Sequence, residues 1–341
     1  MPCMDIIRYR SQKKGNVILI RDGLSQIMPY ETELISENEC KSFRDRYDEE
    51  GLFSAKADIN GIIVQLFTSD RDHIDMWRDN FYAASDRVRA HARLYCITDK
   101  EEPESKLYFE PATCTAFLFN FDYYGWVKSI ALGIAGYILE GTHDTYSVHG
   151  AAIDVDDVGV TLIAPSKTGK TTQSWGLLRA DNSSLISDDW YFVTFGNGRP
   201  KVTGSEKNCY IDADIGDVWE EYKPLVKNVK FDNKGRGIAN VRWVTGESSV
   251  SQGCSLRYVI LLQRNTFEKE VVQKIDSHRA LEYLMSADLC NPHQIVRDPF
   301  RSTLRANFFK KLFEQCEVYM VNTTGTPQET QAAIRKIVGV E

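Results

Sequence analysis

The chain has 341 residues, of which 26% are charged and 43% are hydrophobic. This composition is typical of an ordinary globular protein, and it excludes collagen-like, disordered and coiled-coil chains. The formal net charge is −7, from 41 Lys and Arg against 48 Asp and Glu, which argues against a general nucleic-acid binder. At roughly 150 residues per domain, the length predicts about two domains.

The cysteines and the apolar segments indicate in which cellular compartment the protein is expected. None of the eight cysteines forms a C-x-x-C pair or a zinc-type spacing, and we expect reduced, buried thiols. Residues 1–10 lack the apolar region of a signal peptide. The longest apolar stretch, near Ile130–Leu139, is too short to span a bilayer. We therefore expect a cytoplasmic protein that binds neither membrane nor nucleic acid, and we leave a homo-oligomer open.

Residues 1–144 predict an α+β accessory domain. Asp70 is a candidate N-cap for a helix whose apolar positions recur at steps of three and four as far as Val88. A second helix is expected from about Trp126 to Glu140, where two glycines, Gly133 and Gly136, indicate close packing. β-branched and aromatic runs predict strands at residues 17–20, 62–67, 94–98, 107–109 and 115–121.

Strands and helices alternate after about Asp144, which we take as the boundary of a second, α/β domain at residues 145–341. The segment 145–165 predicts two strands joined by a turn at Asp156–Gly159. Further strands are expected near 255–263 and 318–322, and helices near 277–287, 300–313 and 329–338. This order predicts a mixed sheet with covering helices.

The most informative segment follows a short run of β-branched residues, Val160–Ile163, which predicts a buried strand. Residues 164–171 (A-P-S-K-T-G-K-T) match the pattern G-x-x-x-x-G-K-[ST], except that alanine replaces the first glycine. A loop that enters a helix N-terminus directs backbone N–H groups and the helix dipole at a phosphate. Gly169 would allow close approach, Lys170 would contact the phosphates, and the Thr171 hydroxyl would bind Mg²⁺. The alternative is a chance G-K-T-T at a capped helix start.

Two adjacent carboxylates, Asp188 and Asp189, end the next predicted strand (L-I-S-D-D-W), which we expect beside the P-loop strand. Phosphoryl transfer uses one carboxylate to hold Mg²⁺ and another to accept the hydroxyl proton. Neighbouring aspartates also push each other's pKa apart. An exposed acidic turn is the alternative. His149, followed by a glycine, ends a strand that we expect to adjoin the P-loop, and it is either structural or part of the site.

These motifs together, V-H-G-A-A-I, V-T-L-I-A-P-S-K-T-G-K-T-T and L-I-S-D-D-W, resemble the catalytic domain of HPr kinase/phosphorylase. The chain is also similar to the related nucleotide core of ATP-dependent phosphoenolpyruvate carboxykinases. The resemblance covers about residues 145–330 and is strongest over 147–190. It implies a mixed-sheet P-loop kinase domain of this type behind the N-terminal α+β domain. The E-x-R-G-x-G signature of HPr kinases does not follow, so the resemblance names no acceptor.

The resemblance also implies roles for single residues. Asp188 would be the general base, supported by His149, while Asp189 and Thr171 would hold Mg²⁺; the order of the two aspartates stays open. D-N-K-G-R-G-I-A-N is similar to a carboxykinase segment whose arginine faces the γ-phosphate, which nominates Arg236 as a charge stabiliser, the alternative being a basic loop residue. The phosphates would be bound by Ser166, Lys167, Thr168, Gly169, Lys170, Thr171 and Thr172.

The leading hypothesis is an ATP- and Mg²⁺-dependent kinase that transfers the γ-phosphate to a hydroxyl of a small metabolite or to a serine of a peptide or protein. One alternative is an HPr-type regulatory protein serine kinase, which would dock its protein substrate on a C-terminal aromatic stripe, Phe308–Phe313. A second alternative is a nucleotide-binding sensor without turnover. It is favoured by Ala164 and by Lys167, which stands where a glycine is expected.

Overall fold

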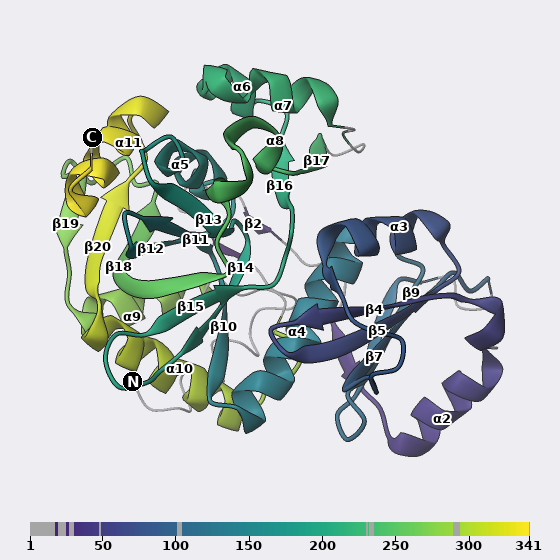
Figure 1. The fold of residues 1–341 in the computed structure, drawn as a ribbon. Coiled ribbons are helices and arrows are strands. Elements are labelled where there is room, and N and C mark those ends of the chain that lie inside the picture. Colours follow the sequence, from purple (N-terminus) through teal and green to yellow (C-terminus); the bar gives the residue numbers. More distant parts are fainter. Residues whose placement is uncertain are drawn as a thin grey trace.

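The structure is a computed structural model, and it describes residues 18–19, 25–26, 31–47, 49–100, 104–229, 231, 235–288 and 294–340. Cys3, Cys290 and the segment 1–10 lie outside the described residues. The described chain is α/β, with two large mixed sheets and helices packed on them (Figure 1). A short pair of strands, β1 (Ile18–Leu19) and β2 (Ser25–Gln26), precedes the first large sheet.

The first large sheet has seven strands in the order β3-β8-β9-β7-β5-β4-β6. It is mixed: β5, β7 and β9 run parallel, while β4 and β8 pair antiparallel with β5 and β9. The expected strands at 62–67, 94–98, 107–109 and 115–121 are confirmed. The elements are β3 (Thr32–Leu34), α2 (Glu37–Arg46), η1 (Glu49–Gly51), β4 (Phe53–Ile59), β5 (Ile62–Thr68), α3 (Arg71–Asn80), β6 (Tyr82–Ala83), β7 (Ala92–Ile97), β8 (Lys106–Glu110) and β9 (Thr115–Phe119).

The helix α3 begins as predicted but ends eight residues early. The Asp70 side chain accepts a hydrogen bond from the backbone N–H of Asp72 and so caps the helix at its start. The expected continuation to Val88 is wrong, because the chain leaves the helix at Asn80 and enters β6. There Ala83 pairs with Ala57 of β4, so pairing along the sheet edge overrides the helical period.

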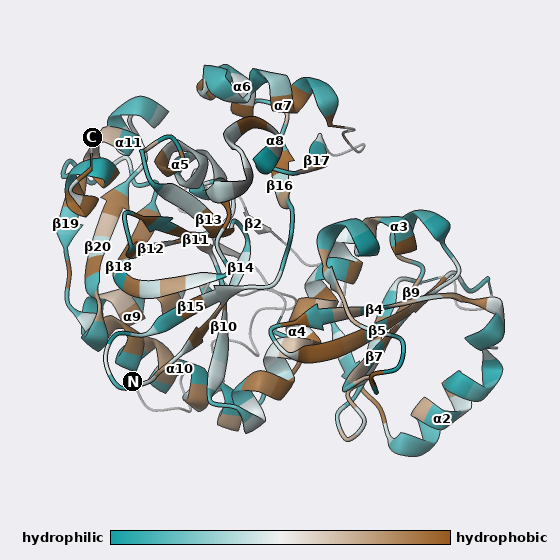
Figure 2. Cartoon of the chain, viewed as in Figure 1, coloured by the Kyte–Doolittle hydropathy of each residue, from teal (hydrophilic) through white to brown (hydrophobic). Residues whose placement is uncertain are grey.

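The helix α4 (Tyr124–Thr142) connects the two sheets. It is hydrophobic on nearly every side, and most of its residues are buried; Figure 2 shows it brown where α2 is teal. Gly136 confirms the expected close packing, because a Cβ added there would lie 2.7 Å from Ser147 Oγ. At the other end of the helix, buried Glu140 accepts from Arg301 at 2.6 Å and from Arg305 at 3.0 Å. These ion pairs connect α4 to the helix α10 (Pro299–Gln315).

The second large sheet has nine strands, along the path β10-β14-β15-β18-β12-β11-β13, with β20 beside β18 and β19 beside β20. The expected strands near 255–263 and 318–322 are confirmed. The strands are β10 (Thr145–His149), β11 (Ala151–Val155), β12 (Val158–Ile163), β13 (Ser183–Ser187), β14 (Trp190–Thr194), β15 (Lys201–Gly204), β18 (Gly253–Gln263), β19 (Val272–Lys274) and β20 (Glu317–Asn322).

The segment 145–165 forms three strands, where we expected two. The first expected strand breaks at Gly150: β10 pairs with β14, whereas β11 pairs with β12 and β13. Glycine is required at the break, since a Cβ there would lie 2.7 Å from the carbonyl oxygen of Leu162. The predicted turn is present, with Asp156 and Asp157 both at positive φ.

Helices cover both faces of the second sheet. Ile260 of β18 packs in the same cluster as α5 (Lys170–Leu177) and α11 (Pro327–Val338). Its neighbours on the strand, Val259 and Leu261, pack with α9 (Ser277–Ser286) and α10 (Pro299–Gln315). The helices expected near 277–287, 300–313 and 329–338 are thereby confirmed.

The aromatic stripe on α10, on which the alternative HPr-type kinase would dock its substrate, belongs to the core. Phe308, Phe309, Leu312 and Phe313 are all at most 3% exposed, because they fill the core between α10 and the sheet. The helix therefore presents no aromatic surface there to a protein substrate.

A small lobe follows β15 and lies above the sheet in Figure 1. Its strands β16 and β17 pair antiparallel, with Asp212 opposite Arg236. The elements are β16 (Cys209–Asp212), α6 (Ile215–Val218), η2 (Glu220–Tyr222), α7 (Lys223–Asn228), β17 (Arg236–Ala239), α8 (Arg242–Thr245) and η3 (Glu247–Ser249).

Two expectations concern the chain as a whole. None of the helices in the described ranges has the length and apolar character that a membrane span requires. The six described cysteines are free thiols. Cys40, Cys96 and Cys209 are buried as expected, and burial raises the pKa of Cys96 to about 12, whereas Cys114, Cys254 and Cys316 are partly exposed.

Candidate active site

The segment 164–169 forms a loop between β12 and α5, as the motif predicts. Gly169 is the N-cap of α5 with φ 94°, and Lys167 is also left-handed with φ 65°. Such a conformation costs a non-glycine residue roughly 1–2 kcal/mol, which is the physical reason for expecting glycine at position 167. The Thr168 hydroxyl donates to the Pro165 carbonyl at 2.7 Å and closes the loop on itself. The arrangement leaves the backbone at the start of α5 suited to an anion.

The two aspartates lie in the turn between β13 and β14. The Ser187 hydroxyl accepts from the backbone N–H of Trp190 at 3.1 Å, and the Gly150 N–H donates to the Asp189 carbonyl at 2.8 Å. These bonds fix the turn against the break between β10 and β11. We expected the strand of the acid pair and the strand of His149 to lie beside β12, and both expectations are wrong. The strand β11 separates β13 from β12, and β10 pairs with β14. The two aspartates and His149 thus approach the loop 164–169 from the ends of β13 and β10, neither of which is adjacent to β12.

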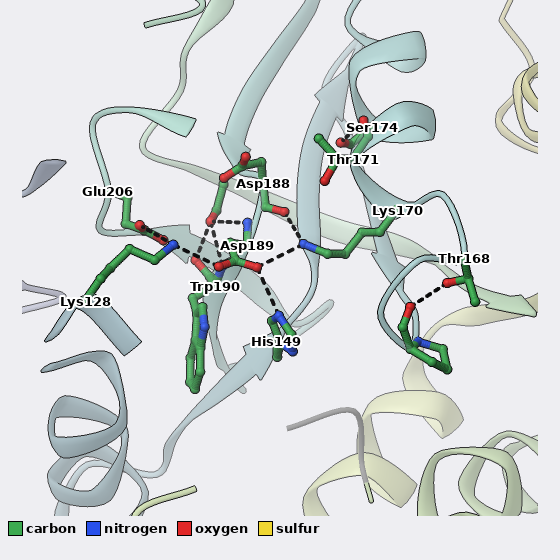
Figure 3. A network of polar contacts seen from close by, with 12 residues as sticks. Lys128, His149, Thr168, Lys170, Thr171, Ser174, Asp188, Asp189, Trp190 and Glu206 are labelled. Carbon is green, nitrogen blue, oxygen red and sulfur yellow. Dashed lines mark hydrogen bonds and ion pairs between the residues drawn. The ribbon is translucent and has the colours of Figure 1, made fainter. Parts of the chain in front are cut away.

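Asp189 is the centre of the polar network in Figure 3. Its Oδ1 lies 3.1 Å from Lys170 Nζ and 3.0 Å from His149 Nε2, and its Oδ2 lies 2.8 Å from Lys128 Nζ. Burial would raise the pKa of Asp189, but Lys128, Lys170 and His149 outweigh it and hold that pKa well below the usual value. Asp189 is therefore an ionised carboxylate at neutral pH.

Asp188 has the opposite character. It is 3% exposed, and burial raises its pKa to about 7, with a contribution from the adjacent charge of Asp189 and against the attraction of Lys170. Lys170 also donates to the backbone carbonyl of Asp188. A carboxyl group with a pKa near 7 can accept or release a proton at physiological pH.

Sequence reasoning missed Lys128 and Glu206, which complete the network. Lys128 comes from α4 and is 4% exposed, and its ammonium lies 3.1 Å from Glu206 Oε1. Burial alone would lower the pKa of Lys128, but Asp189 and Glu206 raise it well above the usual value. One signal was available: Lys128 is the single charged residue in the apolar run Trp126–Leu139.

One cavity of about 400 Å³ gathers most of the predicted residues, with Lys128 on its wall. The exception is Thr168, whose side chain is turned into the loop. Arg236 lies in the cavity wall on β17, 3.7 Å from Asp212, whereas Lys207 is directed to the Arg78 carbonyl. The predicted residues in the wall are His149, Ser166, Lys167, Gly169, Lys170, Thr171, Thr172, Asp188, Asp189 and Arg236. The structure adds Tyr123, Trp126, Tyr210, Asp214 and Arg264, among others.

The donor set fits Mg²⁺ only in combination with phosphate oxygens. Thr171 offers a hydroxyl and Asp189 a carboxylate, both hard oxygen ligands of the kind that Mg²⁺ prefers. Among the described residues, no group of three or more His, Cys, Asp or Glu side chains is placed to hold a metal ion. Mg²⁺ is commonly held by one or two carboxylates and the substrate phosphates. A metal ion at Asp189 Oδ1 would compete with Lys170, which lies 3.1 Å away.

Comparison with known proteins found no relative of this chain. No family model matches the chain, and no curated protein matches it.

Replacing Lys128 with methionine should destabilise the protein by about 3–5 kcal/mol, because it leaves Asp189 and Glu206 buried without their shared cation. The free energy of unfolding in urea measures the loss. Adding Glu206→Gln to Lys128→Met should recover part of it. Lys207→Met is the matched control, since Lys207 donates to a backbone carbonyl, and should cost about 1 kcal/mol or less. A loss below about 1 kcal/mol for Lys128→Met would contradict the role of this network.

Proposed function

We propose that the protein is a kinase that transfers the γ-phosphoryl group of Mg²⁺-bound ATP to a hydroxyl group. The observation that carries the proposal is the meeting of two motifs in one cavity: the ammonium of Lys170, at the end of the phosphate loop, lies 3.1 Å from a carboxylate of the acid pair. Phosphoryl transfer requires a cationic cradle for the phosphates and a proton acceptor on the opposite side. The cavity offers both.

Asp188 and Asp189 have different roles in the proposed reaction. Asp188, whose pKa is about 7, takes the proton of the acceptor hydroxyl. The hydroxyl oxygen forms a bond to the γ-phosphorus while the bond from that phosphorus to the β,γ-bridging oxygen breaks, and ADP leaves with the electron pair. Asp189 keeps its negative charge throughout. His149, which we expected to support Asp188, bonds Asp189 at 3.0 Å and fixes the orientation of that carboxylate.

The cations act on the phosphates. Lys170 moves from Asp189 to the β- and γ-phosphate oxygens when a nucleotide enters, and Arg236 stabilises the charge that develops in the transition state. Thr171 and Asp189 would hold Mg²⁺, which neutralises phosphate charge when bound. The backbone N–H groups of the loop and of the α5 N-terminus orient the chain of phosphates.

A sensor without turnover is the second candidate. It is favoured by the left-handed Lys167 and by the three partners that hold Asp189 in this form. An HPr-type regulatory protein kinase is disfavoured, because the aromatic residues of α10 on which it would dock its substrate are buried.

The proposal is tested with the full-length protein, Mg²⁺ and ATP labelled at the γ-phosphate, incubated with hydroxylated metabolites, amino acids and serine peptides. We expect a labelled phosphomonoester and one equivalent of ADP for at least one acceptor. Nucleotide affinity is measured in the same samples by calorimetry. Tight ATP binding with no labelled product on any acceptor would favour the sensor, and the absence of ATP binding would refute both candidates.

A further inference from the structure

The cavity has two chemically different halves on either side of the acid pair. Figure 3 shows Lys170 and Thr171 on one side of Asp189 and Lys128 with Glu206 on the other. The first side is formed by the phosphate loop. The second side, which we call the acceptor half, is formed by the start of α4 and by the small lobe; its wall residues are Tyr123, Trp126, Lys128, Tyr210, Asp212, Asp214 and Arg236.

Aromatic rings form much of the acceptor half. Tyr123 and Trp126 pack edge to face with centroids 5.8 Å apart, and both are half-buried. Tyr210 already faces a cation, because the Lys128 ammonium lies 4.7 Å from the centre of its ring. Aromatic faces attract ammonium groups through the ring quadrupole, most strongly for tryptophan and tyrosine.

The charges of the acceptor half favour a cationic ligand. Lys128 is compensated by Asp189 and Glu206. In the proposed reaction Arg236 contacts the γ-phosphate. Asp212, which lies 3.7 Å from Arg236 in this structure, then has no cation from that residue. Within the part of the chain that the structure describes, no ion pair involves Asp214, which stands at the exposed rim. Two carboxylates thus remain beside three aromatic rings once the nucleotide is bound.

We infer that the acceptor is an alcohol that also carries a protonated amine or a quaternary ammonium group. Its cation lies against Trp126 near Asp214, and its hydroxyl reaches Asp188. This inference rests on the proposed function, which assigns Arg236 to the phosphate. A neutral polyol would gain no charge attraction from Asp212 and Asp214, and a polyanionic acceptor would be repelled by them.

The test uses pairs of alcohols with nearly the same shape that differ in charge. Ethanolamine is paired with propan-1-ol, and choline with 3,3-dimethylbutan-1-ol. Binding to the full-length protein is measured by ligand-observed NMR in the presence of Mg²⁺ and ADP. We expect each cation to bind about tenfold more tightly than its neutral counterpart. Asp214→Asn and Trp126→Leu should each remove most of that difference without changing ADP affinity.

Turnover of the same pairs with ATP separates this inference from the proposed function. Selective binding of the cations, with no phosphate transfer to them or to any acceptor of the wider panel, supports the ammonium site and overturns the kinase. Phosphate transfer to propan-1-ol or glucose as efficiently as to ethanolamine overturns the inference and keeps the kinase. Equal binding of choline and 3,3-dimethylbutan-1-ol, or binding of neither, overturns the inference whatever the turnover shows.

Discussion

Replacing Lys170 with alanine is expected to reduce kcat/KM for phosphate transfer by about a thousandfold, or about 4 kcal/mol of transition-state stabilisation. The ammonium of Lys170 lies at the junction of the phosphate loop and the acid pair, 3.1 Å from Asp189, and no other described lysine connects these two parts of the cavity in this way. ATP binding should weaken as well, because the phosphates lose a point charge. Steady-state kinetics and calorimetry measure the two effects.

Two controls make this result specific. Lys201→Ala removes an exposed lysine from β15 of the same sheet and should leave kcat/KM unchanged. Lys170→Arg keeps the charge with a different geometry and should restore nucleotide binding more than turnover. Near-normal turnover by Lys170→Ala would contradict the phosphate-cradle role of the loop.

Replacing Asp188 with asparagine is expected to remove activity and to stabilise the fold at the same time. Loss of the proton acceptor should lower kcat by about 10²–10⁴-fold while ATP binding is retained. The stability effect follows from the pKa of Asp188, which burial raises to about 7 in the folded chain. Between about pH 4 and pH 7 the folded chain holds a proton that the unfolded chain has lost, so stability falls as pH rises through this window. Asparagine mimics the protonated form, and at pH 8 it should raise the free energy of unfolding by up to about 4 kcal/mol.

Asp189→Asn is the matched control because the sign of its effect is opposite. The pKa of Asp189 is held well below its usual value, so its ionised form stabilises the fold above about pH 4, and that contribution is lost as pH falls further. Asp189→Asn should therefore lower the free energy of unfolding at pH 8. Urea unfolding of both variants at pH 5 and pH 8 measures the contrast, and a loss of stability in Asp188→Asn at pH 8 would refute the assignment of a raised pKa.

Local signals in the sequence predicted most elements and the loop between β12 and α5. Alternation and β-branched runs located strands such as β5 and β18, and an N-cap located the start of α3. The G-K-T pattern predicted the loop and the start of α5 because its requirements are local: a strand, a glycine and a helix N-terminus.

Features that depend on distant pairing could not be predicted in the same way. The insertion of β11 between β12 and β13 depends on long-range pairing, and the end of α3 depends on an edge strand that pairs with β4. Lys128 and Asp189 are 61 positions apart, so no spacing rule links them.

The placement of Lys128 couples the candidate site to the seven-stranded sheet. The ammonium that compensates Asp189 comes from a helix whose other residues belong to the core of the seven-stranded sheet. A change that loosens that core would disturb the charge balance of the acid pair before any residue of the phosphate loop moved. The part of the chain after α4 is thus not an independent unit, and grafting it onto another scaffold would require a substitute cation for Asp189.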